Sequence, residues 1–167
     1  MTCLPFLAAF GAAVSGCEPA AAPEPQAAPN ALYRSLDSAG AAVDPLAARD
    51  VISVYRRNKG LQTVYVDTAL QEVARARVAA MAKANAVSQA AGGPLKARLA
   101  AAKVQQSTAV ENVSAGYHTM AEAFAGWRQS PFHDANMLNP KVRRIGIATA
   151  YVPGSKYKVF WSLVLTD

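Results

Sequence analysis

Two helical patterns occupy the central part of the chain. Asp44 followed by Pro45 is typical of a helix start, because the carboxylate caps free backbone amides and proline fits the first helical position. This helix should end at Asn58-Lys59-Gly60. A second helix should begin at Asp67 or Thr68, and its apolar residues recur three and four positions apart, at Leu70, Val73, Ala74, Val78 and Met81. Each helix should bury one face.

Alternating patterns typical of strands dominate the end of the chain. Larger apolar residues alternate with small ones over 145–151, and a second alternating run covers 157–165. Pro153-Gly154 separates the runs, so an antiparallel hairpin is expected. The small positions of the first run are Gly146, Ala148 and Ala150. They would let a helix approach one face of the sheet closely.

Shorter patterns lie between these two regions. Residues 108–114 have strand character, and residues 95–103 are expected to form a short helix. The run 119–122, Thr-Met-Ala-Glu, matches a capping box and should open a helix through Trp127. Ser130-Pro131 should start another helical turn. This order of elements predicts an α+β fold in which helices cover a small antiparallel sheet.

The first 43 residues are interpreted as an export signal followed by a tether. Residues 4–14 form an apolar run that is too short to span a membrane but has the length of a signal-peptide core. Val-Ser-Gly-Cys at 14–17 resembles the bacterial lipobox, in which small residues precede a cysteine that is lipidated. No Lys or Arg precedes the apolar run, which departs from the usual signal peptide. We predict a signal peptide over 1–16 and a lipidated Cys17.

A Pro/Ala-rich tether is predicted over 17–43. Prolines at 19, 23, 25 and 29 forbid a helix there and favour an extended chain that would hold a domain away from a membrane. Residues 31–36 could instead pack on the domain. The predicted location is the bacterial cell envelope, in the periplasm or at the surface, with membrane anchoring through Cys17.

Composition narrows the choice of partners. The chain has 17 Lys and Arg residues against 11 Asp and Glu residues, a formal net charge of +6. The basic residues are scattered, which is typical of a solvated surface; examples are Arg56, Arg57, Lys59, Arg75, Arg77, Lys83, Arg143 and Arg144. No helix-turn-helix or aromatic-basic motif is visible, so nucleic acid is a poor candidate. Both cysteines lie in the first 17 residues, so a domain over 44–167 can form no internal disulfide.

Three segments carry a family resemblance. The most specific covers 127–138 and reads Trp-Arg-Gln-Ser-Pro-Phe-His-Asp-Ala-Asn-Met-Leu; the others are Val-Glu-Asn-Val at 110–113 and Ile-Gly-Ile-Ala at 145–148. In order and spacing they resemble the CAP superfamily, also called SCP-like, in its bacterial form. The resemblance covers residues 44–167. It implies an α-β-α sandwich, with a small central antiparallel sheet flanked by helices, and an open cleft.

In that family the cleft often holds histidines and glutamates, sometimes with a divalent metal. Glu111 and His133 match two of those positions. Other positions depart from the pattern: Val110 replaces the glycine before the glutamate, Ser88-Gln89 stands where many bacterial members have Ser-His, and Ser130 stands where eukaryotic members have a second glutamate. At most half of the usual cleft set is present.

The remaining pair limits the chemistry. One imidazole and one carboxylate make a weak zinc site, because catalytic zinc takes three protein ligands and structural zinc takes four. Without metal, Glu111 and His133 could form a general acid-base pair, or could hydrogen-bond each other or the backbone and stabilise the cleft wall. The candidate cleft residues are Glu111, Asn112, His118, Ser130 and His133. Ser130 is also explained as a helix cap, and His118 as an exposed loop residue.

Three functions follow as alternatives. The first is a secreted, membrane-anchored binding module for a lipid, a peptide or a wall-derived ligand. The second is a hydrolase or peptidase that uses Glu111 and His133, with or without a divalent metal such as zinc. The third is a structural or interaction protein with a vestigial cleft. The missing histidine at Gln89 counts against the hydrolase and favours the binding module.

Overall fold

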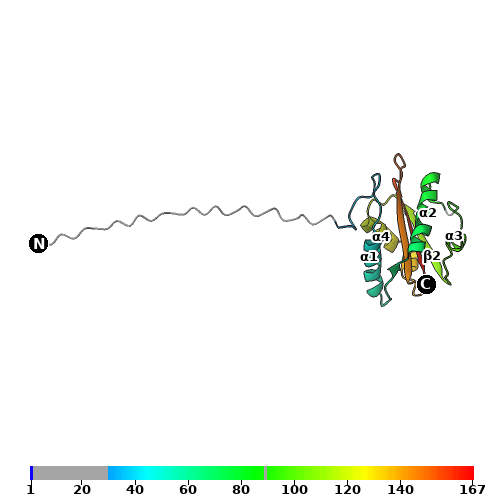
Figure 1. Ribbon diagram of the computed structural model, residues 1–167, viewed down its shortest axis with the longest axis horizontal. Helices are drawn as coiled ribbons and strands as arrows, with labels where there is room; N and C mark the ends of the chain where they lie inside the picture. Colours follow the sequence, from blue (N-terminus) through cyan, green and yellow to red (C-terminus); the bar gives the residue numbers. More distant parts are fainter. Residues whose placement is uncertain (2–29, 89) are drawn as a thin grey trace.

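The computed structural model describes Met1, residues 30–88 and residues 90–167 (Figure 1). The predicted signal peptide, Cys17, the first part of the tether and Gln89 lie outside the described residues. The helices and strands are α1 (Pro45–Arg57), β1 (Tyr65–Val66), α2 (Thr68–Ala84), α3 (Leu95–Ala101), β2 (Ala109–Ala115), α4 (Met120–Gln129), α5 (Pro131–Met137), β3 (Arg144–Tyr151) and β4 (Val159–Thr166). No helix in this described part is long and apolar enough to cross a membrane.

The sheet has four strands in the order β1-β3-β4-β2. The predicted hairpin is confirmed, since β3 and β4 pair antiparallel from Tyr151 opposite Val159 onwards. β2 pairs antiparallel with the other side of β4. The two residues of β1 pair parallel with the start of β3, so the sheet is mixed. A strand of two residues is too short to produce an alternating pattern in the sequence.

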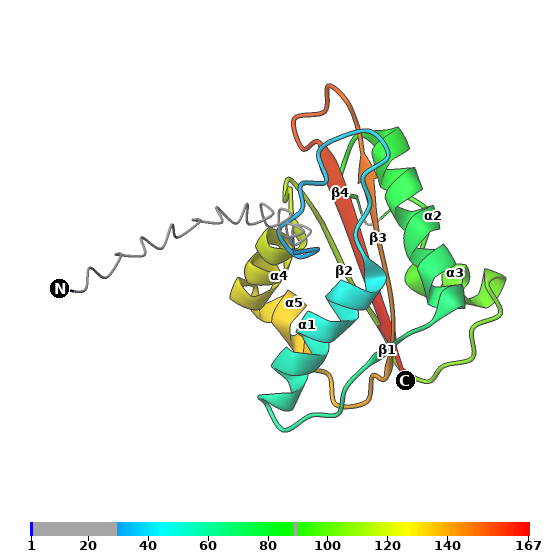
Figure 2. The same cartoon turned by 60° about the vertical axis from the view of Figure 1, so that its left-hand side comes forward.

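Helices cover both faces of the sheet. Figure 2 shows α1, α4 and α5 on one side, with α2 and α3 on the other. Strand β4 is buried along its whole length and divides its side chains between the two faces. Trp161 packs in the core under α1 and α4, whereas Phe160 packs in the core under α2. This is the α-β-α sandwich that the family resemblance implies.

The small face of β3 allows helix α2 to lie directly on the sheet. A Cβ atom added to Gly146 would lie 2.1 Å from the backbone carbonyl carbon of Leu70, well inside van der Waals contact. Gln71, the next residue of α2, accepts a hydrogen bond from the backbone amide of Ile147. Helix α2 therefore also satisfies the Ile147 amide, which lies on β3 past the point where the short β1 ends.

The predicted helix starts are confirmed by their caps. Asp44 accepts hydrogen bonds from the amides at the start of α1, and Asp67 does the same for α2. Thr119 Oγ1 accepts from the Glu122 amide at 3.1 Å. The Glu122 carboxylate accepts from the amide of His118, one residue before the amide that a standard capping box would use.

Part of the segment before α1 belongs to the packed domain. Leu36 is buried in the core beside α1 and α4, and its amide donates to the carbonyl oxygen of His118 at 2.8 Å. Val43 is also buried, and its amide donates to Thr149 Oγ1 on β3. The folded unit therefore includes residues that the sequence pattern assigns to the end of the tether.

Two basic residues expected on the solvated surface are buried instead. Arg56 is 0% exposed and donates hydrogen bonds to the carbonyl oxygens of four residues, Gln62, Met137, Asn139 and Val142. Arg77 is 1% exposed and faces β2. For these two residues the surface interpretation is wrong, because each lies on the apolar stripe of its own helix.

Candidate binding cleft

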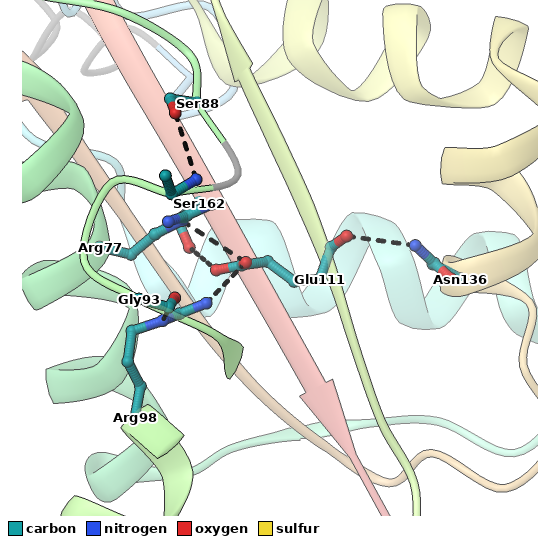
Figure 3. Close-up of polar contacts among 8 residues, drawn as sticks. Arg77, Ser88, Gly93, Arg98, Glu111, Asn136 and Ser162 are labelled. Atoms are coloured by element: carbon teal, nitrogen blue, oxygen red, sulfur yellow. Dashed lines mark hydrogen bonds and ion pairs between the residues drawn. The ribbon is translucent and has the colours of Figure 1, made fainter. Parts of the chain in front are cut away.

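Glu111 points from the edge strand β2 toward α2 and α3, where two arginines converge on it (Figure 3). Its Oε2 atom lies 2.7 Å from Arg98 Nη2 and 3.5 Å from Arg77 Nε. Ser162 Oγ, on the neighbouring strand β4, donates to Oε1 at 3.1 Å. The side chains of Glu111 and Arg98 are only 10% and 9% exposed. One carboxylate thus faces two guanidinium groups in a nearly buried cluster.

The two arginines come from different helices. Arg77 follows Leu70 and Ala74 at helical spacing, so α2 directs it inward with those apolar residues. Burial lowers the pKa of Arg77 from its ordinary value; Glu111 opposes this shift and Arg98 adds to it. Arg98 extends from α3, and its Nε donates to the carbonyl oxygen of Gly93 at 3.2 Å. That bond holds the guanidinium against the loop before α3.

The next residue of β2, Asn112, points to the opposite face of the sheet. Asn112 is fully buried, and its Nδ2 donates to the carbonyl oxygen of His133 at 3.0 Å. Its Oδ1 accepts from Asn136 Nδ2 at 2.8 Å, and the same Asn136 nitrogen donates to the carbonyl oxygen of Glu111 at 3.2 Å. These three bonds attach α5 to the free edge of β2. They assign Asn112 and Asn136 a positioning role.

Ser130 and His133 lie at the start of α5. Ser130 Oγ accepts from the His133 amide at 3.5 Å, which is the capping role expected from the sequence. The His133 ring packs edge-on against Phe132, with 5.8 Å between ring centroids, and burial lowers the pKa of His133. Among the contacts of the described residues, none joins the His133 imidazole to the Glu111 carboxylate. The structure brings Glu111 together with Arg77, Arg98 and Ser162 instead.

His118 lies apart from this cluster, in the turn between β2 and α4. Its Nδ1 atom is 3.5 Å from Asp37 Oδ2, and its carbonyl oxygen accepts from Leu36. Lys158 Nζ approaches the same Asp37 carboxylate at 3.9 Å. His118 therefore helps to hold the segment before α1 on the domain.

The donor set does not fit a zinc ion. No group of three or more His, Cys, Asp or Glu side chains that could hold a metal occurs within residues 30–88 and 90–167. Of the two donors that the sequence offered, Glu111 is paired with arginines and His133 contacts Phe132. We therefore derive no metal chemistry from this cleft.

A cavity of about 310 Å³ lies beside the Glu111 cluster, between α3, β2 and the start of α5. Its charged wall consists of Arg77, Arg98 and Glu111. Phe132 lines it from α5 and is 67% exposed. The remaining lining residues are Gly93, Pro94, Leu95, Ala109, Val110, Val113 and Asn136. The cavity therefore combines a buried charged wall with an apolar rim.

A family model described as the cysteine-rich secretory protein family, CAP, matches residues 49–165. This range spans the elements from α1 to β4 and contains all three motif segments. The chain belongs to the CAP family. The fold class and the family resemblance inferred from the sequence are both confirmed.

Solved structures with the same fold come from three bacteria. The CAP domain matches an extracellular protein containing an SCP domain from Bacillus anthracis, with 24% identity and a TM-score of 0.62 over 72% of this chain. It matches a cysteine-rich secretory protein from Staphylococcus aureus with 20% identity and a TM-score of 0.60 over 74% of this chain. An outer surface protein from Borrelia burgdorferi matches with 14% identity and a TM-score of 0.65, covering 75% of this chain and 96% of that protein.

These matches establish the fold rather than a shared activity. The chain spans only 39% and 38% of the Bacillus and Staphylococcus proteins. No curated protein sequence matches the chain. The function of this CAP domain must therefore be argued from its own cleft.

Sequence reasoning missed the two arginines of the cleft. For Arg77 a signal existed, because its position continues the apolar stripe of α2 through Leu70 and Ala74. For Arg98 the local sequence gives no such signal, since only the packing of α3 against β2 brings it to Glu111. The partners of Glu111 are 34 and 13 positions earlier in the chain (111 minus 77 and 111 minus 98).

Proposed function

We propose that this CAP domain is a ligand-binding module of the bacterial cell envelope. The observation that carries the proposal is a cavity in which a buried charged wall adjoins an apolar rim. Small-molecule sites commonly combine apolar walls with a few well-placed polar groups. The expected ligand is a small amphipathic molecule, such as a lipid, a peptide or a wall-derived fragment.

The contacts of Glu111 favour binding over hydrolysis. Both of its carboxylate oxygens already interact with this chain's own residues, Oε1 with Ser162 and Oε2 with the two arginines. A general base must reach the proton that it removes, and His133 does not share this cluster. Glu111 is therefore proposed to hold the two guanidinium groups in place at the cavity wall.

Export and anchoring form the second part of the proposal. The matched structures from Bacillus and Borrelia are described as extracellular and outer surface proteins, which supports export of this chain. We propose that Cys17 is lipidated and that the following segment tethers the domain. In cells, Cys17→Ser should move the protein from the membrane fraction to the soluble fraction. Unchanged membrane retention of this variant would refute the anchor.

The binding function is tested by native mass spectrometry of the full chain after incubation with an envelope extract. We expect a stoichiometric adduct whose amount falls in Phe132→Ala, because Phe132 lines the cavity. Tyr33→Ala is the matched control, since Tyr33 is also exposed but lies outside the cavity lining. A bare protein mass under every condition would contradict the binding function, and an equal loss in both variants would contradict this cavity as its site.

A further inference from the structure

The hydrogen bonds of Arg98 leave one nitrogen of its guanidinium without a partner. Nη2 donates to Glu111 and Nε donates to the carbonyl oxygen of Gly93. Nη1 is buried and has no hydrogen-bond partner among the described residues. Buried N–H groups are normally satisfied, so this nitrogen makes Arg98, which lines the cavity, a candidate donor to a ligand.

The charge of the cavity wall also indicates a ligand that accepts hydrogen bonds. Glu111 is the only acidic residue among those that line the cavity in the described structure, and it faces both Arg77 and Arg98. The wall therefore carries one net positive charge. Asn136, the remaining polar side chain of the lining, already donates to Glu111 and Asn112. A ligand with a single negative charge would balance the wall, and a planar carboxylate matches the geometry of a guanidinium group.

The edge of the sheet adds a second recognition element. Gly116 donates to the Val159 carbonyl oxygen, so alternation along β2 turns the backbone groups of Ala109, Glu111 and Val113 away from β4. The Glu111 carbonyl oxygen is taken by Asn136, which agrees with this orientation. All three residues line the cavity. Outward-facing backbone groups of an edge strand can pair with an extended peptide, although the Glu111 carbonyl oxygen is already bound by Asn136 and does not take part.

Resting on the binding function proposed above, we propose that the cavity binds the carboxylate of a small apolar ligand through Arg98. The edge of β2 and the rim at Phe132 favour the carboxy terminus of an apolar peptide over an alkyl acid. The cavity, at about 310 Å³, is at the small end of ligand sites, which fits a ligand of two or three residues. Glu111 is then a positioning residue that orients Arg98.

The decisive experiment compares acids with their neutral amides on the unmodified full chain. Isothermal titration would use N-acetyl-Leu-Ala-Ala and its carboxy-terminal amide, together with octanoate and octanamide. We expect the peptide acid to bind with a Kd of about 1 mM or lower and the amide to bind at least about tenfold more weakly. Because no variant is needed, this comparison does not depend on whether a substituted protein folds.

Charge-matched variants then locate the site. Arg98→Gln should weaken binding of the peptide acid by about tenfold or more. Arg75→Gln removes the same charge from a side chain that is 58% exposed on the same helix as Arg77, and it should bind as the unmodified protein does. Circular dichroism would confirm that both variants are folded. Equal losses in the two variants would overturn a specific role for Arg98.

The remaining outcomes separate this inference from the binding function. Equal binding of acid and amide, or no binding of either acid, would overturn the carboxylate site even if the envelope extract yields a ligand. Preferential binding of octanoate over octanamide would support the carboxylate but overturn the peptide as its source. The peptide acid could bind preferentially while the envelope extract yields no ligand. That result would support the carboxylate site but contradict the proposed binding of an envelope ligand.

Discussion

Arg98 and Glu111 form an ion pair across the gap between α3 and β2, with 2.7 Å between Nη2 and Oε2 and both side chains about nine-tenths buried. This pair matters for the stability of the domain mainly because breaking it is costly. Removal of one partner leaves an uncompensated buried charge, whereas removal of both leaves none. Because Arg77 shares the same carboxylate oxygen, Glu111 compensates two charges at once.

Glu111→Ala should therefore destabilise the domain strongly, by about 3–5 kcal/mol in the free energy of unfolding. Arg98→Ala should cost less, because Glu111 keeps its contacts with Arg77 and Ser162. The two substitutions should be non-additive, with the double variant more stable than the sum of single effects predicts. Urea unfolding of the four proteins measures this coupling. Additive effects would show that the two side chains do not interact.

Arg56 is expected to be as important for stability, although its hydrogen bonds within the described residues go to backbone carbonyl oxygens and not to a carboxylate. Its guanidinium donates to four carbonyl oxygens, including those of Met137 and Val142, and so fastens the loop between α5 and β3 to α1. Arg56→Met should lower the free energy of unfolding by about 3 kcal/mol or more. The carbonyl oxygens of Asn139 and Val142 keep another donor, whereas those of Gln62 and Met137 lose Arg56, and each buried carbonyl left unsatisfied costs roughly 1–3 kcal/mol. The exposed neighbour provides the control: Arg57→Met should change urea unfolding little.

These arginines show where sequence reasoning reaches its limit. A charged side chain is usually solvated, so composition alone places Arg56 and Arg77 on the surface. Their helical positions give the better indication: Arg56 continues a stripe through Ala48 and Ile52, all of them buried. Periodicity can thus reveal that a charge faces the core. It cannot identify the partner, because carbonyl oxygens and Glu111 reach these arginines only through tertiary packing.

The elements that the sequence predicted correctly are those with a local physical cause. Helix caps at Asp44, Asp67 and Thr119 depend on residues within one turn. The hairpin of β3 and β4 follows from alternation on both sides of a turn. By contrast, β1 forms because the segment before α2 passes beside β3, which no pattern in two residues could show. The assembly of the cleft depends on the same kind of long-range placement.

A substitution at Gly146 would test the close approach of α2 to the sheet. Gly146→Ala should destabilise the domain by about 1–3 kcal/mol or more, because the new Cβ would overlap backbone atoms of Leu70 and Gln71. Since backbone atoms are involved, shortening the neighbouring side chain should not help. Thermal unfolding of Gly146→Ala with and without Leu70→Ala measures this. Recovery of stability in the double variant would contradict a backbone clash.

His133 should make the domain less stable as the pH falls. Burial lowers its pKa in the folded state below the ordinary value of about 6.5, so near that pH the unfolded chain binds more protons than the folded one. The free energy of unfolding should therefore decrease as the pH falls through about 6.5 and below.

The imidazole resonances of His133, assigned by comparison with His133→Gln, should titrate by NMR with a midpoint below that of an unfolded peptide. The His133→Gln variant should lose part of the decline in stability between about pH 7 and pH 5, because glutamine cannot take up the proton that favours unfolding. Urea midpoints measured across this range for both proteins provide the comparison. A midpoint at or above the ordinary value would mean that the ring is not desolvated as the packing against Phe132 requires.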